Sequence, residues 1–486
     1  MLTLLIPGLL FVPLACAVVS VLLGFRLAGC VARVGAPLQL ALSVALCLAV
    51  AGQGGGLYVL GGWEPPLGIA LRVDGLAVTL VLVTAVVAAA CGLHAVVYLG
   101  VDGEGPRPFW PLFWFLWAGL NGVWLAGDLF NAYVALELIT LSAVGLVALG
   151  GGADALRAAL RYLFAALLGS LAYLLGVALL YGSYGTLSLA GISALATEGG
   201  PERLALALML AGLAIKTALF PLHGWLPPAH STARAPVSAL LSALVIKASF
   251  YLMARLWLDL GGVLGSAALA QFLGAAGAAA IVWGSWMAWR QTRLKMLIAY
   301  SSIAQVGYLF LLFPLVFEAA DAAAQQARQG VTLHLVSHAL AKAAMFLAAG
   351  NLLLAVGDGR VAALAGISRH LPVSLFSFGL AAVSVMGLPP SGGFAGKWLL
   401  LQGSLASGQW WWALFVLAGG LMAAAYVFRV FAASYVESAG SDRFRSPPLV
   451  LEVTPMVLAL AALGLGLVAG GPLVWLAGLS PEAMSP

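Results

Sequence analysis

Long apolar segments repeat along the whole chain, and only short connections with polar or charged residues separate them. A helix needs roughly 20 apolar residues to cross the hydrocarbon core of a bilayer. Lipid offers no partner to the edge of an open sheet, so each of these segments predicts a transmembrane helix. The pattern predicts fourteen, at 2–24, 34–51, 75–99, 109–126, 129–149, 159–182, 204–221, 236–258, 265–288, 294–315, 331–356, 373–403, 410–433 and 452–477.

The positive charges support this count, because they fall mainly in every second connection. With the N-terminus outside, the inside connections carry fourteen arginines and lysines and the outside connections carry four. Cytoplasmic connections of membrane proteins show such an excess. The inside group is Arg26, Arg33, Arg107, Arg157, Arg161, Arg234, Arg290, Arg293, Lys295, Arg360, Arg369, Arg429, Arg443 and Arg445; the outside group is Arg72, Arg203, Arg255 and Arg328. We therefore expect a multi-pass protein of the cell (inner) membrane with both termini extracytoplasmic.

The composition agrees with a chain that folds in lipid. Of its 486 residues, 63 % are hydrophobic and 8 % are charged, whereas soluble domains carry about 25 % charged residues. The sequence thus predicts an all-α polytopic membrane protein without a soluble domain. The net charge of +5 comes from arginines scattered over short connections, which argues against a nucleic-acid partner. The first positive charge is Arg26, so the first apolar segment predicts a retained span rather than a cleaved signal peptide.

Prolines and glycines interrupt two of the predicted spans. The seventh runs into the stretch FPLHGWLPPAH, and the twelfth contains GLPPSGGFAGK. Proline removes a backbone donor and breaks a helix. The prolines at these breaks are Pro221, Pro227 and Pro228 in the seventh span and Pro389 and Pro390 in the twelfth.

The two interruptions stand at corresponding places, which is typical of transporters built from internal repeats. Spans four to eight and nine to thirteen are five helices each, and an odd-sized repeat inverts its topology in the membrane. We therefore expect one membrane domain, 1–486, with helices 1–3 in 1–105, a first repeat in 106–260, a second in 261–435 and the last helix in 436–486.

Four of the five lysines lie inside apolar stretches: Lys216, Lys247, Lys342 and Lys397. A lysine at membrane depth costs about 2.5–3.5 kcal/mol on insertion scales and normally faces a bundle interior or a water path. Burial favours the neutral form of a lysine, so such a residue can exchange a proton near neutral pH. The retention of four suggests that these lysines carry the function.

Glu137 is the only acid well inside a predicted span, and Lys216 is our candidate for its partner. A nearby carboxylate favours the charged form of a lysine, so a change in their separation would switch the affinity of Lys216 for a proton. The alternative is an ion pair that only pins two helices, since structural pairs also perturb titration.

His334, His338 and Lys342 follow one another at intervals of four residues, which places them along one helix face. Two histidines at this spacing can also bind zinc, but no HExxH motif is present and no acid or cysteine in this span completes a site. The four cysteines Cys16, Cys30, Cys47 and Cys91 are likewise isolated. We expect no metal and no cofactor, and we interpret the histidines as a proton relay.

These groups predict a protein that moves protons along a buried chain of Glu137, Lys216, Lys247, His334, His338, Lys342 and Lys397. No phosphate loop, catalytic triad or haem or iron–sulfur ligand set predicts catalysis of its own. Two alternatives belong to other classes: a membrane scaffold that does not conduct, and an independent secondary transporter for a small solute.

The stretch KTALFPLHGWLPPAHSTARAPVSALLSALVIK at 216–247 resembles the antiporter-like proton-translocating subunits. These occur in respiratory complex I, in Mrp-type cation/proton antiporters and in membrane-bound hydrogenases. The resemblance spans about residues 70–435. Supporting matches are LNGVWLAGDLFNAYVALEL at 120–138, RLKMLIAYSSIAQVGY at 293–308, HLVSHALAKAAMF at 334–346 and GLPPSGGFAGKW at 387–398.

The resemblance implies fourteen helices, inverted five-helix repeats, broken helices seven and twelve, and a hydrophilic axis through the seven residues named above. It also implies other membrane subunits as partners, with protons and Na⁺ as the transported ions. Some relatives have Glu where Lys397 stands, and the largest subunits have further helices after the fourteenth. Lys397 and the phrase GDLFNAYVALEL are similar to the D-type subunits of Mrp antiporters. The alternative is a proton-pumping subunit of complex I or a hydrogenase.

Overall fold

The computed structural model describes residues 2–24, 27–63, 68–101, 108–197, 199–317, 319–437, 444–445, 447–468 and 470. Parts of the sequence-based predictions lie outside these residues, namely the charges of Arg26, Arg107 and Arg443 and the stretch 471–477 of the last span.

All fourteen predicted spans are helical in the part of the chain that the structure describes. The first half contains α1 (Leu2–Leu22), α2 (Ala28–Gln53), α3 (Gly75–Val101), α4 (Phe109–Leu125), α5 (Leu129–Ala148), α6 (Gly152–Tyr184), α7 (Leu189–Leu195), α8 (Gly200–Lys216), α9 (Leu226–Thr232), α10 (Ala235–Leu240) and α11 (Ile246–Leu264). A π-helical turn, η2 (Leu241–Val245), joins α10 to α11 within one span.

The second half continues with α12 (Ala267–Arg290), α13 (Leu294–Leu309), α14 (Leu312–Val316), α15 (Asp321–Val356), α16 (Ile367–His370), α17 (Pro372–Met386), α18 (Gly392–Ala406), α19 (Trp411–Tyr435) and α20 (Leu449–Leu467). Eleven of the described helices are long and apolar enough to cross a membrane. The remaining predicted spans are α4 and the two interrupted ones, which the structure divides into α8 and α9 and into α17 and α18.

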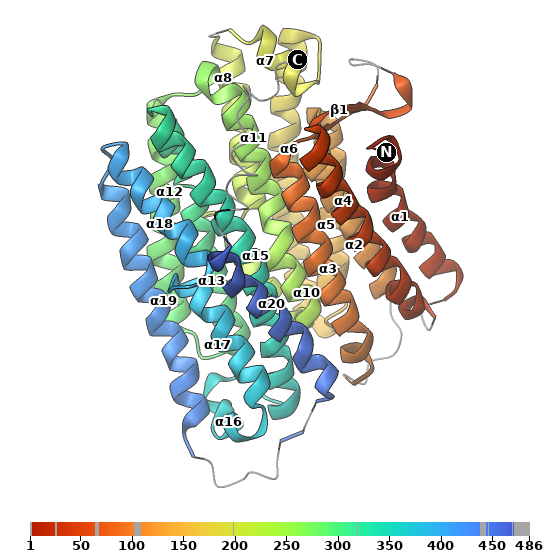
Figure 1. The fold of residues 1–486 in the computed structure, drawn as a ribbon, viewed down its shortest axis with the longest axis vertical. Helices are drawn as coiled ribbons and strands as arrows, with labels where there is room; N and C mark the ends of the chain where they lie inside the picture. The colour runs from red at the N-terminus through yellow and green to blue at the C-terminus, as the bar shows by residue number, and fades with distance from the viewer. Residues whose placement is uncertain are drawn as a thin grey trace.

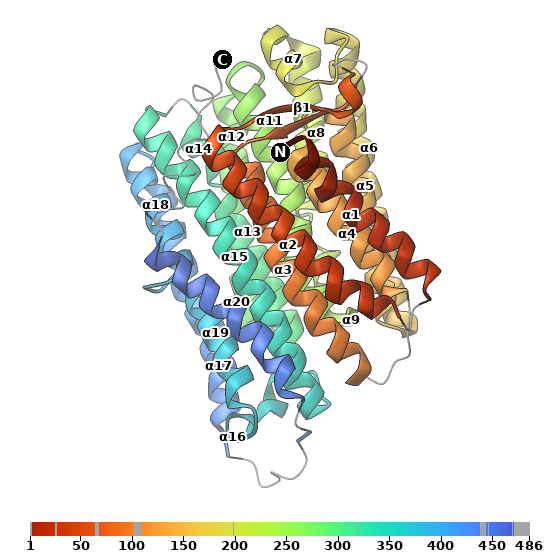
Figure 2. The same ribbon diagram turned by 45° about the vertical axis from the view of Figure 1, so that its right-hand side comes forward.

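The long helices run side by side along the long axis of the molecule (Figure 1). Polar side chains begin several of them by accepting a hydrogen bond from a first-turn amide, as Asp128 does for α5, Ser266 for α12 and Ser391 for α18. Helix α20 returns at an incline across α15 and α17 (Figure 2). The chain therefore forms a single bundle of antiparallel helices.

A small sheet, absent from the sequence-based prediction, lies at one end of the bundle beside the described N-terminus (Figure 2). Strands β1 (Gly56–Val59) and β2 (Ala70–Val73) pair antiparallel, with Gly56 opposite Val73. A backbone bridge joins Leu71 to Ala126 before α5. We call this the hairpin end. The opposite end carries α16 and a backbone bridge between Arg293 and Arg360, and we call it the α16 end.

The centre of the bundle is formed by the spans that contain α11, α13 and α15. In the most apolar stretch of the span Ala235–Leu264, 100 % of residues are buried, against 28 % in α1 and in α20. In the most apolar stretches of the spans Leu294–Val316 and Asp321–Val356, 89 % and 83 % of residues are buried. Polar side chains on these central spans must therefore find most of their partners within the protein.

Candidate functional site

Glu137 on α5 and Lys216 at the end of α8 form an ion pair, as the sequence analysis expected for their geometry. The Nζ–Oε1 distance is 3.0 Å, and the side chains are 19 % and 6 % exposed. Lys216 Nζ also donates to Thr140 Oγ1 at 2.8 Å, and Ser170 on α6 donates its hydroxyl to Glu137. The pair is thus held from three helices inside the bundle.

The chain leaves the helical conformation directly after Lys216. Ala218 has a φ of +57°, a left-handed conformation that is rare for a residue with a side chain. Pro221 lies in this break, whereas Pro227 and Pro228 lie in the first turn of α9. A first-turn amide has no intrahelical acceptor, so these two prolines begin the second half-helix rather than break the first.

A polar connection leads from Lys216 to α11. Thr217 Oγ1 donates to Ser249 Oγ at 2.9 Å. A cavity of about 10 Å³ lies beside Lys216 and is lined also by Thr140, Val245 and Ser249. This volume is close to that of one water-sized probe, the lower limit for a buried water.

Lys247 is the second residue of α11, which directly follows the π-helical turn, and it is 1 % exposed. Its Nζ donates to the backbone carbonyl of Ser242 at 2.8 Å, inside that turn. The Ser242 hydroxyl in turn contacts the Ser302 hydroxyl of α13 at 2.8 Å. Such π-helical turns are frequent at functional sites, because they leave carbonyls with irregular geometry.

His334, His338 and Lys342 lie on one face of α15, fully within the bundle. The two imidazole rings are parallel, with centroids 5.8 Å apart and an interplanar angle of 3°. His334 Nε2 contacts the Gln305 carbonyl at 3.1 Å, and Lys342 donates to the Ile298 carbonyl at 3.2 Å and to the Ser301 hydroxyl. The predicted row of titratable groups therefore faces α13.

Lys397 on α18 reaches the end of the other half-helix, α17. Its Nζ donates to the carbonyl of Val385 at 2.7 Å and lies 4.4 Å from the centre of the Tyr308 ring. The last carbonyls of a helix lack intrahelical donors and carry partial negative charge, so a lysine is favourable there. Pro389 and Pro390 lie between α17 and α18, where the sequence analysis expected the break.

Helix α13 links these groups, a role that the sequence-based prediction did not include. Its residues Ser301, Ser302, Gln305 and Tyr308 contact, respectively, Lys342, Ser242, His334 and Lys397. The signal was present in the sequence, because polar residues at intervals of three and four in an apolar span form one polar helix face.

A second set of charged residues, outside the predicted proton path, forms a network at the hairpin end. Arg255 Nη2 lies 2.5 Å from Asp74 Oδ1, Arg72 Nε lies 3.1 Å from Asp74 Oδ2, and Arg72 Nη1 lies 2.7 Å from Asp259 Oδ2. Burial acts to raise the pKa of Asp74, but the guanidinium groups of Arg255 and Arg72 and the Ala77 amide outweigh it and lower that pKa. This four-residue network connects the part of α11 near the hairpin end to β2 and to the residue that precedes α3.

Across the residues that the structure describes, no group of three or more His, Cys, Asp or Glu side chains is arranged to hold a metal ion. The bundle instead contains a half-buried carboxylate, four buried lysines and two buried histidines. Such groups accept and release protons and need no cofactor to do so.

Comparisons with known proteins place this arrangement in context. A family model described as "NADH:quinone oxidoreductase/Mrp antiporter, TM" matches residues 126–423. The NADH-quinone oxidoreductase subunit N of Desulforudis audaxviator is 38 % identical over 433 residues, which are 84 % of each chain. The D-type subunit of a Na⁺/H⁺ antiporter from Bacillus subtilis is 31 % identical and covers 76 % of this chain and 74 % of its own length.

Chains of three solved membrane complexes have a similar fold over almost the whole length of this chain. A chain of an archaeal membrane-bound sulfane sulfur reductase, a respiratory membrane complex, has a TM-score of 0.89 at 28 % identity, covering 97 % of this chain and 96 % of its own. A chain of the Mrp complex from Dietzia sp. has a TM-score of 0.88 at 25 % identity, covering 99 % and 98 %. A chain of complex I from Thermus thermophilus has a TM-score of 0.75 at 25 % identity, covering 97 % and 99 %.

Proposed function

The chain belongs to the family of NADH:quinone oxidoreductase and Mrp antiporter transmembrane subunits, and from this premise we propose that it translocates protons along its own buried side chains. The single observation that carries the proposal is the Glu137–Lys216 ion pair, with a half-buried carboxylate and a buried lysine, beside the break that follows α8. The proposed path consists of Glu137, Lys216, Lys247, His334, His338, Lys342 and Lys397.

Glu137 sets the proton affinity of Lys216 in this mechanism. At 3.0 Å the carboxylate stabilises the ammonium form, and separation of the pair would leave a buried lysine whose neutral form is favoured. The irregular backbone after Lys216 and the contacts from Thr140 and Ser170 offer alternative positions for the two side chains. Lys216 therefore binds or releases one proton when its distance from Glu137 changes.

Beyond Lys216 the proton passes to Lys247, then to the segment of His338 and Lys342, and leaves past Lys397. Both ring nitrogens of His338 and the Nδ1 atom of His334 lack a hydrogen-bond partner among the described protein atoms. Buried polar atoms are almost always satisfied by protein or by ordered water. We therefore propose that water molecules between α13 and α15 bridge the steps between these side chains.

Substitution of the ion pair tests the proposal directly. Lys216→Ala and Glu137→Ala should each abolish coupled proton transport while the assembled complex is recovered in normal amount. Lys216→Arg should also fail, because arginine keeps its proton. Arg157→Gln, which alters an exposed ion pair with side chains 71 % and 85 % exposed, is the matched control and should transport normally. Transport near the wild-type rate in Lys216→Ala or Glu137→Ala would refute the switch.

At the finer level we propose a D-type subunit of a multisubunit Na⁺/H⁺ antiporter. The lysine at position 397 and the similarity to the D-type antiporter protein of Bacillus subtilis support this assignment. A proton-pumping subunit of a complex I is the second candidate, and the 38 % identity to an N-type subunit favours it. In both cases the partners are other membrane subunits, and the driving force comes from outside this chain.

Gentle purification of the tagged chain from its native membrane, followed by mass spectrometry, separates the two candidates. Co-purification of small hydrophobic subunits without redox proteins would support the antiporter, and Na⁺-dependent proton transport should then be measured in vesicles. Co-purification of iron–sulfur, flavin or nickel subunits would support a redox-driven pump. A complete complex that transports normally with Lys216→Ala would instead favour a scaffold role.

A further inference from the structure

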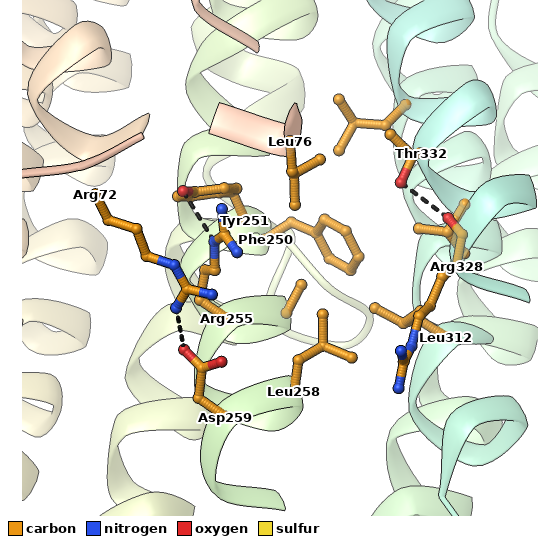
Figure 3. Close-up of a pocket in the computed structure, with 13 residues that line it drawn as sticks. Arg72, Leu76, Phe250, Tyr251, Arg255, Leu258, Asp259, Leu312, Arg328 and Thr332 are labelled. Atoms are coloured by element: carbon orange, nitrogen blue, oxygen red, sulfur yellow. Dashed lines mark hydrogen bonds and ion pairs between the residues drawn. The ribbon is translucent and has the colours of Figure 1, made fainter. Parts of the chain in front are cut away.

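A cavity of about 60 Å³ lies at the hairpin end between α11 and α15 and is not part of the path described above. A buried water needs roughly 10–15 Å³ of such volume, so this cavity has room for several water molecules. Figure 3 shows Arg72, Arg255 and Asp259 on one side of the cavity and Arg328 and Thr332 on the other. Most of the lining is apolar, but each wall carries charged or polar side chains with which water inside the cavity can form hydrogen bonds.

The inner end of the cavity points toward the middle of the proton path. Phe250 on α11 and Leu335 on α15 line the cavity. Lys247 precedes Phe250 by three residues, and His338 follows Leu335 by three residues. Because α11 runs toward the hairpin end and α15 runs away from it, both titratable groups lie one helical turn deeper, or about 5 Å along each axis. A thin apolar layer separates them from the cavity.

Ion pairs fix one wall of the cavity in position. Arg255 donates to Asp74 and, through Nε, to the Tyr251 hydroxyl at 3.0 Å, and Tyr251 donates to the Trp124 carbonyl at 2.7 Å. Asp74 directly precedes α3 and accepts a hydrogen bond from the Ala77 amide of its first turn, and Trp124 belongs to α4, so this wall is connected to two further helices. The cavity is therefore built on a rigid frame rather than on a loose surface groove.

Charged side chains of both signs lie at the cavity. Arg72, Arg255, Arg328 and Asp259 belong to its lining, and the neighbouring Asp74 pairs with Arg72 and Arg255. Such polar groups give water molecules partners inside a cavity. Asp259, 17 % exposed and paired with Arg72, is a carboxylate of this lining.

We propose that this cavity is an outlet of the proton path that opens from the Lys247–His338 junction to the hairpin end. The proposal rests on the proposed function and extends it, because a proton can then leave from the middle of the path without reaching Lys397. Phe250 and Leu335 act as the apolar gate, and a shift of either side chain connects the junction to the water in the cavity.

Cysteine modification tests the outlet on the complete complex in membrane vesicles of both orientations. The four native cysteines are replaced first, and Thr332→Cys or Leu258→Cys is introduced into the cavity wall. A membrane-impermeant, positively charged methanethiosulfonate reagent is added from each side. Reaction is followed by mass spectrometry, and proton transport is measured separately. The control is Leu195→Cys on α7, which is 54 % exposed and does not line the cavity.

We expect both cavity cysteines to react from the hairpin side, and each modified variant should lose most of its proton transport. Leu195→Cys should react and keep its proton transport. Unchanged transport after reaction of either cavity cysteine would overturn the outlet, because a bulky cation then fills the cavity without effect. Failure of both to react while Leu195→Cys reacts would also overturn it. Failure of the proposed function itself is distinguishable, since the cysteine-free parent would then show no transport before any reagent is added.

Discussion

Charged side chains in this chain are buried in pairs, and their contribution to stability depends on both members. Asp74 and Arg255 are 4 % and 7 % exposed and lie 181 residues apart in the sequence. Removing one member of a buried pair leaves an uncompensated charge in a medium that solvates it poorly. The network at the hairpin end is thus expected to stabilise the packing of α3 against α11.

Asp74→Asn should lower the stability of the purified complex by about 3–5 kcal/mol, because Arg255 loses its closest counter-charge. The folded-state pKa of Asp74 lies below the unfolded value, so its stabilising effect is complete above the unfolded pKa and is lost as the pH falls through the folded pKa. Thermal unfolding measured from neutral to acidic pH should show this loss in the wild type and a smaller one in Asp74→Asn.

The exposed pair of Asp154 and Arg157 provides the control, since its side chains are 85 % and 71 % exposed. Asp154→Asn should leave the melting temperature nearly unchanged. An Asp74→Asn protein with the melting temperature and pH profile of the wild type would contradict the assigned role of this network.

Residue types and local spacing were enough to predict Lys216 as the partner of Glu137, whereas the role of the seven titratable groups in a proton path stays a prediction. A charge inside an apolar span is conspicuous, and few groups are available to pair with it. The links made by Ser301, Ser302 and Gln305 were missed, because small polar residues are tolerated in membrane helices without any special role. Only the three-dimensional arrangement shows that one face of α13 contacts Lys342, Ser242 and His334.

At the scale of elements, both interrupted helices end in a left-handed residue next to a buried lysine. In the first, Ala218 adopts φ +57° two residues after Lys216. In the second, Gly387 adopts φ +81°, and a Cβ built there would lie 2.7 Å from Lys397 Cδ. Glycine at 387 therefore satisfies both the backbone conformation and the close approach of the lysine.

Gly387→Ala should destabilise the protein by at least about 1–2 kcal/mol, the cost of a left-handed conformation with a side chain. It should also displace Lys397 from the Val385 carbonyl, so proton transport should fall together with the melting temperature. The matched control is Gly182→Ala within α6, where no atom lies within 4 Å of the added Cβ. That change should leave stability equal or slightly higher. Equal melting temperatures for the two variants would show that the turn after α17 is not strained by a side chain.

Helix ends were the least accurate part of the sequence-based prediction. The eleventh span was expected at 331–356, but α15 begins at Asp321, and the eighth was expected to end at 258, but α11 continues to Leu264. Hydropathy marks only the lipid-embedded part of a helix, whereas charged residues such as Arg328 and Asp259 can extend it beyond the apolar window. Two of the charged residues that line the cavity at the hairpin end, Asp259 and Arg328, lie on these unpredicted extensions.

At the scale of the whole molecule, the described helices alternate in direction, so the connections fall at two opposite ends. Most described arginines of the inside group, such as Arg157 and Arg290, belong to the α16 end, and Arg72 and Arg203 belong to the hairpin end. The division into two inverted repeats and the orientation in the membrane remain predictions. The orientation determines the direction of the proposed outlet, because that cavity opens at the hairpin end.

Labelling of intact cells tests this orientation. In a background without native cysteines, Trp63→Cys lies at the hairpin end, where the tryptophan is 68 % exposed, and Asp154→Cys lies at the start of α6 near the α16 end. The excess of positive charge at the α16 end predicts that this end is cytoplasmic. An impermeant maleimide should therefore label Trp63→Cys in intact cells and Asp154→Cys only after the membrane is opened. The reverse labelling pattern would show that the hairpin end is cytoplasmic. The proposed outlet would then release protons into the cytoplasm.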